Sequence, residues 1–253
     1  MNESKVYTYI DENYFYWFTI NRPDKRNAID YDVMNALESA LVEVRENTAI
    51  RGFIITGSGE HSFCSGGDLS VFHALHTKEE AYAMLFKMGE LLHNLMTLPV
   101  PTIALLNGTA IGGGCEIASA CDLRWAVTNA KLGFVQGNLG ITTGWGGASM
   151  LMEKIPHANA IRMLASSRVF TAEEAMDLGF IQKVVPSFDT QSLQEEIAVS
   201  SDVLRSYKKT FISKWEQTSL KERMLAEIEQ CSILWERDEH HEAVNAFLDS
   251  KKK

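Results

Sequence analysis

A short stretch at residues 110–119, AIGGGCEIAS, sets three consecutive glycines and one carboxylate, Glu116, in an otherwise apolar run. If a helix begins at the glycines, Gly113 and Glu116 lie three residues apart on the same face. The first N–H groups of a helix have no partner within it, and the helix dipole adds partial positive charge there. The stretch therefore predicts an amide that can hold an oxyanion beside a carboxylate that can move a proton. The alternative is a buried structural carboxylate paired with an arginine, such as Arg124 or Arg162, or with a backbone donor.

A second glycine pair occurs in residues 61–72, HSFCSGGDLSVF, where Gly66 and Gly67 precede a predicted helix. Two N–H donors from separate loops, aimed at one carbonyl oxygen, would form an oxyanion hole that stabilises developing negative charge. Neither glycine element has the spacing of a dinucleotide-binding or phosphate-binding loop. Each loop taken alone is equally consistent with a tight turn.

The elements that must position these residues alternate between strands and helices. Strands are predicted at residues 14–20, 51–56, 102–106, 123–127 and 180–185. Helices are predicted around 33–44, 79–98 and 115–120, and after a capping box formed by Thr171 and Glu174. This alternation predicts an α/β fold.

The strand signal ends near residue 187, and residues 193–248 are predicted to form two or three helices, one opened by a capping box at Ser219 and Glu222. The sequence thus predicts two parts, an α/β core over residues 1–187 and a helical region over residues 188–253.

Composition limits the possible functions. The chain has 253 residues, 45% of them hydrophobic, and a net charge of −9, which argues against a nucleic-acid partner. Its four cysteines form no CxxC pair, which favours reduced thiols in a cytoplasmic protein. The polar, acidic start predicts no signal peptide, and no segment is apolar for the length of a membrane span. His73 and His76 have no third ligand nearby in sequence, so no metal site is expected.

Several motifs in fixed order resemble the crotonase (enoyl-CoA hydratase/isomerase) superfamily. They are INRPDKRNAID, FCSGGDL, NGTAIGGGCEIASACDLRWA, GFVQGNLGITTGWGG and the ending HHEAVNAFLDSKKK. The resemblance covers about residues 5–250. It implies a spiral of ββα units, a C-terminal helical trimerisation region, and homotrimers or dimers of trimers. It also implies an acyl-CoA thioester as substrate, with its carbonyl oxygen held by the amides of Gly67 and Gly113, and no cofactor beyond the coenzyme A of the substrate.

The same resemblance assigns the candidate catalytic residues. Glu116 matches the first catalytic glutamate of hydratases, whereas the position of the second glutamate holds Gln136. A glutamine can hold a water or a substrate carboxylate, but it cannot take up and release a proton at neutral pH. The pattern resembles the methylmalonyl/ethylmalonyl-CoA decarboxylase branch and favours decarboxylation of a malonyl-type acyl-CoA. The alternatives are an enoyl-CoA hydratase or isomerase that uses Glu116, or a non-enzymatic scaffold that binds CoA or RNA.

The resemblance also implies which residues contact coenzyme A: Lys25, Arg26, Ala28, Ser65, Asp68, Leu69 and Phe247. For the basic residues, the alternative is that they are solvated surface charges. Phe247 is expected to pack within the helical region and to reach the CoA of a neighbouring subunit. The terminal lysines, residues 251–253, are further candidates for the CoA phosphates.

Overall fold

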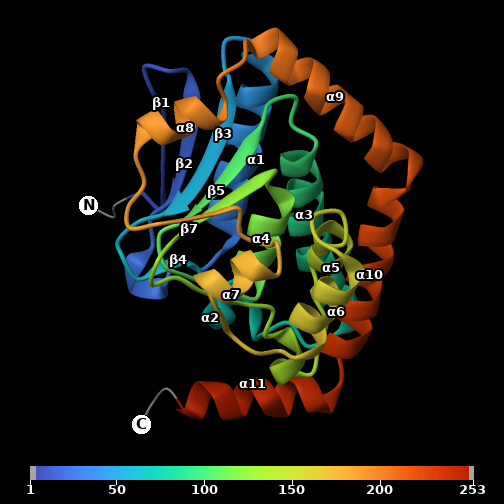
Figure 1. Cartoon of the computed structure of the whole chain (residues 1–253). Helices are drawn as coiled ribbons and strands as arrows, with labels where there is room; N and C mark the ends of the chain where they lie inside the picture. Colours follow the sequence, from blue (N-terminus) through green and yellow to red (C-terminus); the bar gives the residue numbers. More distant parts are fainter. Residues whose placement is uncertain (1–3, 251–253) are drawn as a thin grey trace.

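The computed structural model describes residues 4–250, so the terminal lysines lie outside the described residues. A six-stranded sheet forms its frame, in the order β1-β2-β3-β5-β7-β10 (Figure 1). These strands are β1 (Val6–Ile10), β2 (Phe15–Ile20), β3 (Gly52–Gly57), β5 (Thr102–Leu106), β7 (Leu123–Val127) and β10 (Lys183–Val185). β1 runs antiparallel to β2, and all the other neighbours in this sheet are parallel.

A smaller sheet has the order β4-β6-β8-β9. Its strands are β4 (Ser62–Cys64), β6 (Thr109–Ile111), β8 (Lys131–Gly133) and β9 (Phe170–Thr171). The pairs β3 and β4, β5 and β6, and β7 and β8 each place one strand in the large sheet and the next in the small sheet. Helices follow each pair, so the chain winds as a spiral of ββα units. The α/β fold class and the crotonase-like spiral are therefore confirmed.

The helices of the spiral are α1 (Tyr31–Glu46), α2 (Leu69–Phe72), α3 (Lys78–Met96), α4 (Gly113–Ala120), α5 (Gly147–Leu151), α6 (His157–Ala165) and α7 (Ala172–Asp177), with 3-10 turns η1 (Pro23–Lys25) and η2 (Gln136–Leu139). Four of these helices, α1, α2, α3 and α7, begin at side-chain caps, whereas among the described residues α4, α5 and α6 have none. The Asp30 side chain accepts from the first amides of α1, and Thr171 and Glu174 form the predicted capping box of α7. The predicted strand at 180–185 is shorter than expected, because only Lys183–Val185 pair with β7.

Both faces of the large sheet are buried at its central strands β3 and β5, and the alternation of side chains along each strand divides them. Phe53 and Ile55 of β3 face the main core beneath α1, α3 and α4, whereas Ile54 faces a second apolar cluster. That second cluster is closed by Leu193 and Leu204 from the helical region. Sheets covered on both faces are typical of parallel α/β architecture.

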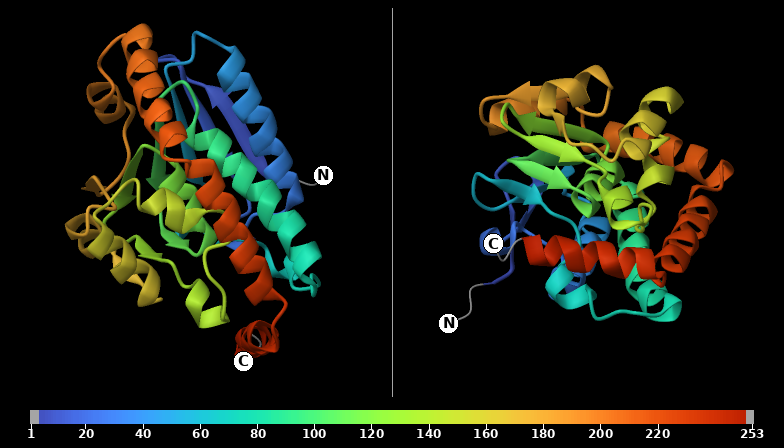
Figure 2. Two further views of the ribbon diagram at one scale, coloured as in Figure 1. Left: turned by 90° about the vertical axis from the view of Figure 1, so that its right-hand side faces the viewer. Right: turned by 90° about the horizontal axis from the view of Figure 1, so that it is seen from below.

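After β10 the described chain is helical, as predicted, but it forms four helices. They are α8 (Thr190–Glu196), α9 (Ser201–Gln217), α10 (Leu220–Trp235) and α11 (Asp238–Ser250). The capping box predicted at Ser219 is wrong: this residue is left-handed, with φ 50°, and its side chain makes no capping hydrogen bond. α10 packs along α3 and α5, and α11 crosses the lower end of the molecule (Figures 1 and 2).

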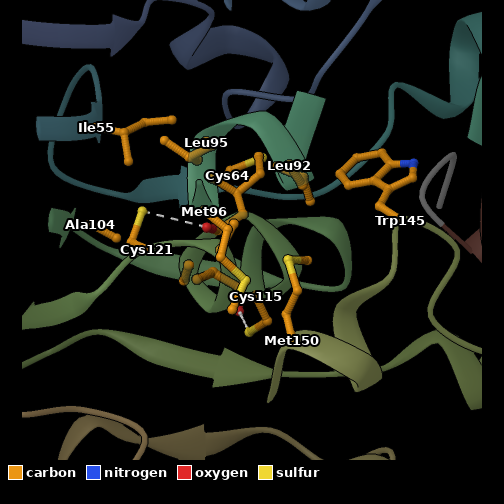
Figure 3. Close-up of a cluster of buried hydrophobic side chains, with 14 of the residues drawn as sticks. Ile55, Cys64, Leu92, Leu95, Met96, Ala104, Cys115, Cys121, Trp145 and Met150 are labelled. Atoms are coloured by element: carbon orange, nitrogen blue, oxygen red, sulfur yellow. Dashed lines mark hydrogen bonds between the residues drawn. The ribbon is translucent and has the colours of Figure 1, made fainter. Parts of the chain in front are cut away.

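The helical region shares the core of the spiral, since Met224 and Ile228 of α10 belong to the same apolar cluster as β3. All four cysteines are buried free thiols. Two of them lie in the core around α4, where the Cys115 and Cys121 thiols donate to backbone carbonyl oxygens (Figure 3). Across residues 4–250, none of the helices has the length and apolarity needed to cross a bilayer.

Candidate active site

A cavity of about 1270 Å³ lies between α3, α4, η2, the loop before α2 and the helices α10 and α11. Its lining brings together every described residue that the sequence analysis selected as a catalytic residue or a CoA contact. These are Glu116, Gly67, Gly113, Gln136, Lys25, Arg26, Ala28, Ser65, Asp68, Leu69 and Phe247. A large, partly apolar pocket with a few convergent polar groups is the usual form of a small-molecule site.

The two glycine loops meet at one side of this cavity. Gly113 is the first residue of α4, and a Cβ at Gly66 would lie 3.0 Å from the Gly113 nitrogen, so the loops are in direct contact. Within residues 4–250, neither the Gly67 nor the Gly113 N–H donates a hydrogen bond to the protein. The Trp145 ring packs against both residues so closely that a Cβ at Gly113 would overlap it. Two unpaired amides therefore line the same cavity.

Glu116 lies on the next turn of α4 with its side chain buried, at 2% exposure. Its Oε2 accepts from the amides of Trp145 (2.8 Å) and Gly147 (2.9 Å), and its Oε1 accepts from the amide of Gly144 (3.4 Å) and from Gln136. The pairing with Arg124 is wrong, because Arg124 donates to the carbonyl oxygens of residues 118, 121 and 180. The other form of that alternative, a carboxylate paired with backbone donors, describes the contacts of Glu116. Glu116 is thus a buried carboxyl group held by neutral donors.

The pKa of Glu116 is raised from 4.5 to about 7. Burial is the main cause, because it disfavours the charged form, and the negative charge of Glu227 adds to it. The amides of Trp145, Gly147 and Gly144 oppose the shift, since they stabilise the carboxylate. A carboxyl group with this pKa exchanges its proton near neutral pH, as a general acid or base must.

Gln136 faces Glu116 across the cavity from η2. Its Nε2 donates to Glu116 Oε1 at 2.9 Å, and the residue is 9% exposed. Its Oε1 is buried and finds no hydrogen-bond partner within residues 4–250. Buried polar atoms are normally paired, so an open acceptor at a cavity wall marks a place for a water or a ligand.

Some of the residues expected to contact CoA are already engaged within the protein. The Asp68 carboxylate caps α2 through Ser70 and binds Arg22 at 2.7 Å, and Arg22 also donates to the carbonyl oxygen of Ala28. By contrast, Lys25 and Arg26 are exposed beside the cavity. Within residues 4–250, neither side chain is held in an ion pair, so both cations can meet an anionic ligand.

Comparison with known proteins agrees with this geometry. The family model of enoyl-CoA hydratase/isomerase matches residues 12–253. The chain belongs to this family. Its fold also matches the enoyl-CoA hydratase of Bacillus halodurans with a TM-score of 0.84, at 26% identity over 96% of this chain and all of that one.

Relatives within the family differ in the reaction they are named for. The ethylmalonyl-CoA decarboxylase of Bos taurus is 32% identical, over 89% of this chain and 76% of its own length. The short-chain-enoyl-CoA hydratase of Clostridium acetobutylicum is 30% identical, over 92% of this chain and 91% of its own length. The chain is therefore a crotonase-family enzyme rather than a bare scaffold, and an acyl-CoA substrate is consistent with that family.

The structure adds site residues to this family member that sequence reasoning missed. Trp145 lies in the motif GWGG, which was recognised without a role for its ring. Trp235 and His240 line the cavity from the helical region, and His240 Nδ1 lies 2.7 Å from the carbonyl oxygen of Leu139. Phe247 lines the cavity of its own chain. No local pattern could reveal these contacts, because they join segments far apart in sequence.

Proposed function

We propose that this enzyme binds a malonyl-type acyl-CoA and decarboxylates it through a thioester enolate. The observation that carries the proposal is the pairing of one carboxyl group, Glu116, with one carboxamide, Gln136, beside two unpaired amides in a single cavity. Such a site can hold an oxyanion and deliver one proton. At the position facing Glu116 it offers a carboxamide instead of a second carboxylate, and the Asp68 carboxylate of the lining is bound to Arg22 and Ser70.

In the proposed reaction the thioester carbonyl oxygen accepts hydrogen bonds from the N–H groups of Gly67 and Gly113. The bond between the α-carbon and the substrate carboxylate breaks, its electron pair forms the enolate, and CO₂ leaves. Glu116 in its neutral form then donates its proton to the α-carbon, and solvent restores that proton. Removing a single oxyanion donor typically costs about 10²–10³ in rate.

The carboxamide suits a substrate that carries its own carboxylate. Gln136 uses one N–H of its Nε2 group on Glu116, and the second N–H remains available for the substrate. A glutamate at this position would place like charges together in a site of low dielectric constant, which is unfavourable. The resemblance to the bovine ethylmalonyl-CoA decarboxylase supports the same choice.

Hydration of an enoyl-CoA is the second candidate, and one observation favours it. The unpaired Gln136 Oε1 can accept a hydrogen bond from a water molecule, which ionised Glu116 would activate. Glu116 would then have to perform both proton transfers. The clostridial short-chain-enoyl-CoA hydratase is the relative that supports this reaction.

Both reactions should be measured in the wild type and in Gln136→Glu. We expect CO₂ release from methylmalonyl- or ethylmalonyl-CoA by the wild type, and only slow hydration of crotonyl-CoA. In Gln136→Glu, decarboxylation should fall by about tenfold or more, which corresponds to about 1.4 kcal/mol, and hydration should rise. Brisk hydration by the wild type, with no CO₂ release from any malonyl-type thioester, would contradict the proposal.

We also propose that Lys25 and Arg26 bind the CoA phosphates, that the protein works in the cytoplasm, and that it assembles as a trimer or a dimer of trimers. The exposed apolar residues of α9, Val203, Tyr207 and Phe211, recur every four residues and support a subunit contact there. Light scattering tests the assembly, and a stable monomer at micromolar concentration would contradict it. Loss of CoA-dependent thermal stabilisation in Lys25→Ala would support the phosphate assignment.

A further inference from the structure

One segment, residues 143–149 with the sequence TGWGGAS, comprises a loop and the first turn of α5 and is called loop 143–149 below. Two carboxylates, Glu116 and Glu227, accept hydrogen bonds from it. On the cavity side, the amides of residues 144, 145 and 147 donate to Glu116. This loop is therefore what holds the Glu116 carboxyl group in place. It also carries the Trp145 ring, which packs against the two oxyanion glycines.

On the far side, Glu227 of α10 accepts from the same loop. The Thr143 hydroxyl and the amide of Ala148 (2.9 Å) donate to Glu227 Oε1, while the amide (2.8 Å) and hydroxyl (2.7 Å) of Ser149 donate to Oε2. Both oxygens are therefore used, and the donors flank the residues that hold Glu116.

We propose that Glu227 is a positioning residue for the acid Glu116, fixing loop 143–149 from the side opposite the cavity. The inference rests on the proposed function only in treating Glu116 as the working acid. Glu227 does not line the cavity, so it acts through the loop and through its charge rather than by touching substrate.

The negative charge of Glu227 has a second effect, because it changes the pKa of Glu116. A like charge nearby disfavours ionisation, and Glu227 is the charged side chain that raises the pKa of Glu116. Burial also raises the pKa of Glu227 itself, against the opposing hydrogen bonds from Thr143, Ser149 and Ala148. The charge of Glu227 therefore makes Glu116 hold its proton more tightly.

Within residues 4–250, the elements packed against α4 supply no competing charge. The residues of α5, β5 and β6 include no titratable side chain, and the buried face of α3 has none either. The remaining neighbours are the thiols of Cys64 on β4, Cys115 on α4 and Cys231 on α10. Burial raises the pKa of each thiol far above neutrality, so all three stay uncharged.

Two substitutions separate the charge of Glu227 from its geometry. Glu227→Gln keeps the length of the side chain and removes the charge, but it turns an NH₂ group toward donors of the loop. Glu227→Asp keeps the charge and withdraws the carboxylate by one methylene from the loop. Glu229→Gln is the matched control, because Glu229 is an exposed carboxylate on the same helix, paired with Lys78 at 3.1 Å.

The primary readout is the titration of Glu116 by NMR of ¹³C-carboxyl-labelled glutamate, with its signal assigned by loss in Glu116→Gln. This measurement needs no turnover, so it tests Glu227 even if decarboxylation itself is not found. We expect Glu227→Gln to lower the midpoint of Glu116 by about one pH unit. The protonated fraction at pH 7 would then fall from about one half to about one tenth, a roughly fivefold loss.

Turnover on whichever thioester proves active is the second readout. In Glu227→Gln the alkaline limb of the pH profile should move to lower pH, whereas in Glu227→Asp turnover should fall at every pH with the midpoint in place. If Glu227→Gln does not fold, the double variant Thr143→Val and Ser149→Ala replaces it, because it removes the two hydroxyl groups that donate to Glu227. This double variant should also have a lower turnover than the wild type. A Glu116 midpoint in Glu227→Gln equal to that in Glu229→Gln would overturn the inference, whatever happens to stability.

Discussion

The raised pKa of Glu116 predicts that its ionised form destabilises the folded protein. A carboxyl group with a pKa of about 7 when folded, against 4.5 ordinarily, binds its proton more tightly in the folded state. The free energy of unfolding therefore falls as pH rises from about 4.5 to about 7. At 1.36 kcal/mol per pKa unit, the full loss is about 3 kcal/mol above pH 7.

Glu116→Gln removes the ionisable carboxyl group, and with it the fall in the free energy of unfolding between pH 4.5 and pH 7. Between pH 4.5 and pH 8 we expect the stability difference from the wild type to shift by up to about 3 kcal/mol in favour of the variant, because at pH 4.5 Glu116 is neutral when folded and only half ionised when unfolded. Turnover should fall at least a hundredfold, because a carboxamide cannot donate the proton. CoA binding should persist, since Lys25 and Arg26, the proposed phosphate contacts, are unchanged in the variant.

Urea unfolding of both proteins at pH 4.5, 6 and 8 measures the first effect, and initial rates on the active thioester measure the second. Glu229→Gln serves again as the control, because an exposed carboxylate should shift neither quantity. A stability difference between the wild type and Glu116→Gln that is the same at all three pH values would refute the raised pKa of Glu116. Undiminished turnover in Glu116→Gln would show that the role of Glu116 is structural.

Other predictions concern the oxyanion loops and the buried charges. Gly113→Ala should abolish turnover, because the new Cβ overlaps the Trp145 ring, whereas Gly67→Ala should cost less, since its Cβ meets only the edge of a phenyl ring at 3.0 Å; equal rates in the two variants would contradict this. Lys208→Met removes the partner 2.7 Å from Asp122 and should lower the free energy of unfolding by about 3 kcal/mol with kcat unchanged. A loss of kcat in Lys208→Met that accompanies the loss of stability would show that the pair of Lys208 and Asp122 influences the active site.

Local patterns predicted the parts of the site that depend on neighbouring residues. The spacing of Gly113 and Glu116 placed an amide and a carboxyl group on one helical face, and the structure puts both at the cavity. The strand β1 was missed because most of its side chains are exposed, so it lacks the usual apolar alternation. The box at Ser219 failed because a left-handed residue cannot present its hydroxyl to the helix amides.

Contacts between distant segments escaped prediction for a different reason. Glu227 lies 84 residues beyond its partner Thr143, and nothing in the pattern of α10 distinguishes this glutamate from its neighbours on the same helix. Its role depends on which loop α10 packs against, and only the folded chain decides that.

The grip of α10 on loop 143–149 also sets an order of events during synthesis. The glycine loops and Glu116 emerge from the ribosome well before Glu227, because α10 follows them in the chain. Until α10 docks, the far side of loop 143–149 lacks its acceptor, and the Glu116 carboxyl group is held by a loop secured on one side only. A nascent chain thus carries the chemical groups of the site before they are held in place. On the proposed role of Glu227, the site is complete only when α10 docks, although α10 supplies no reacting atom.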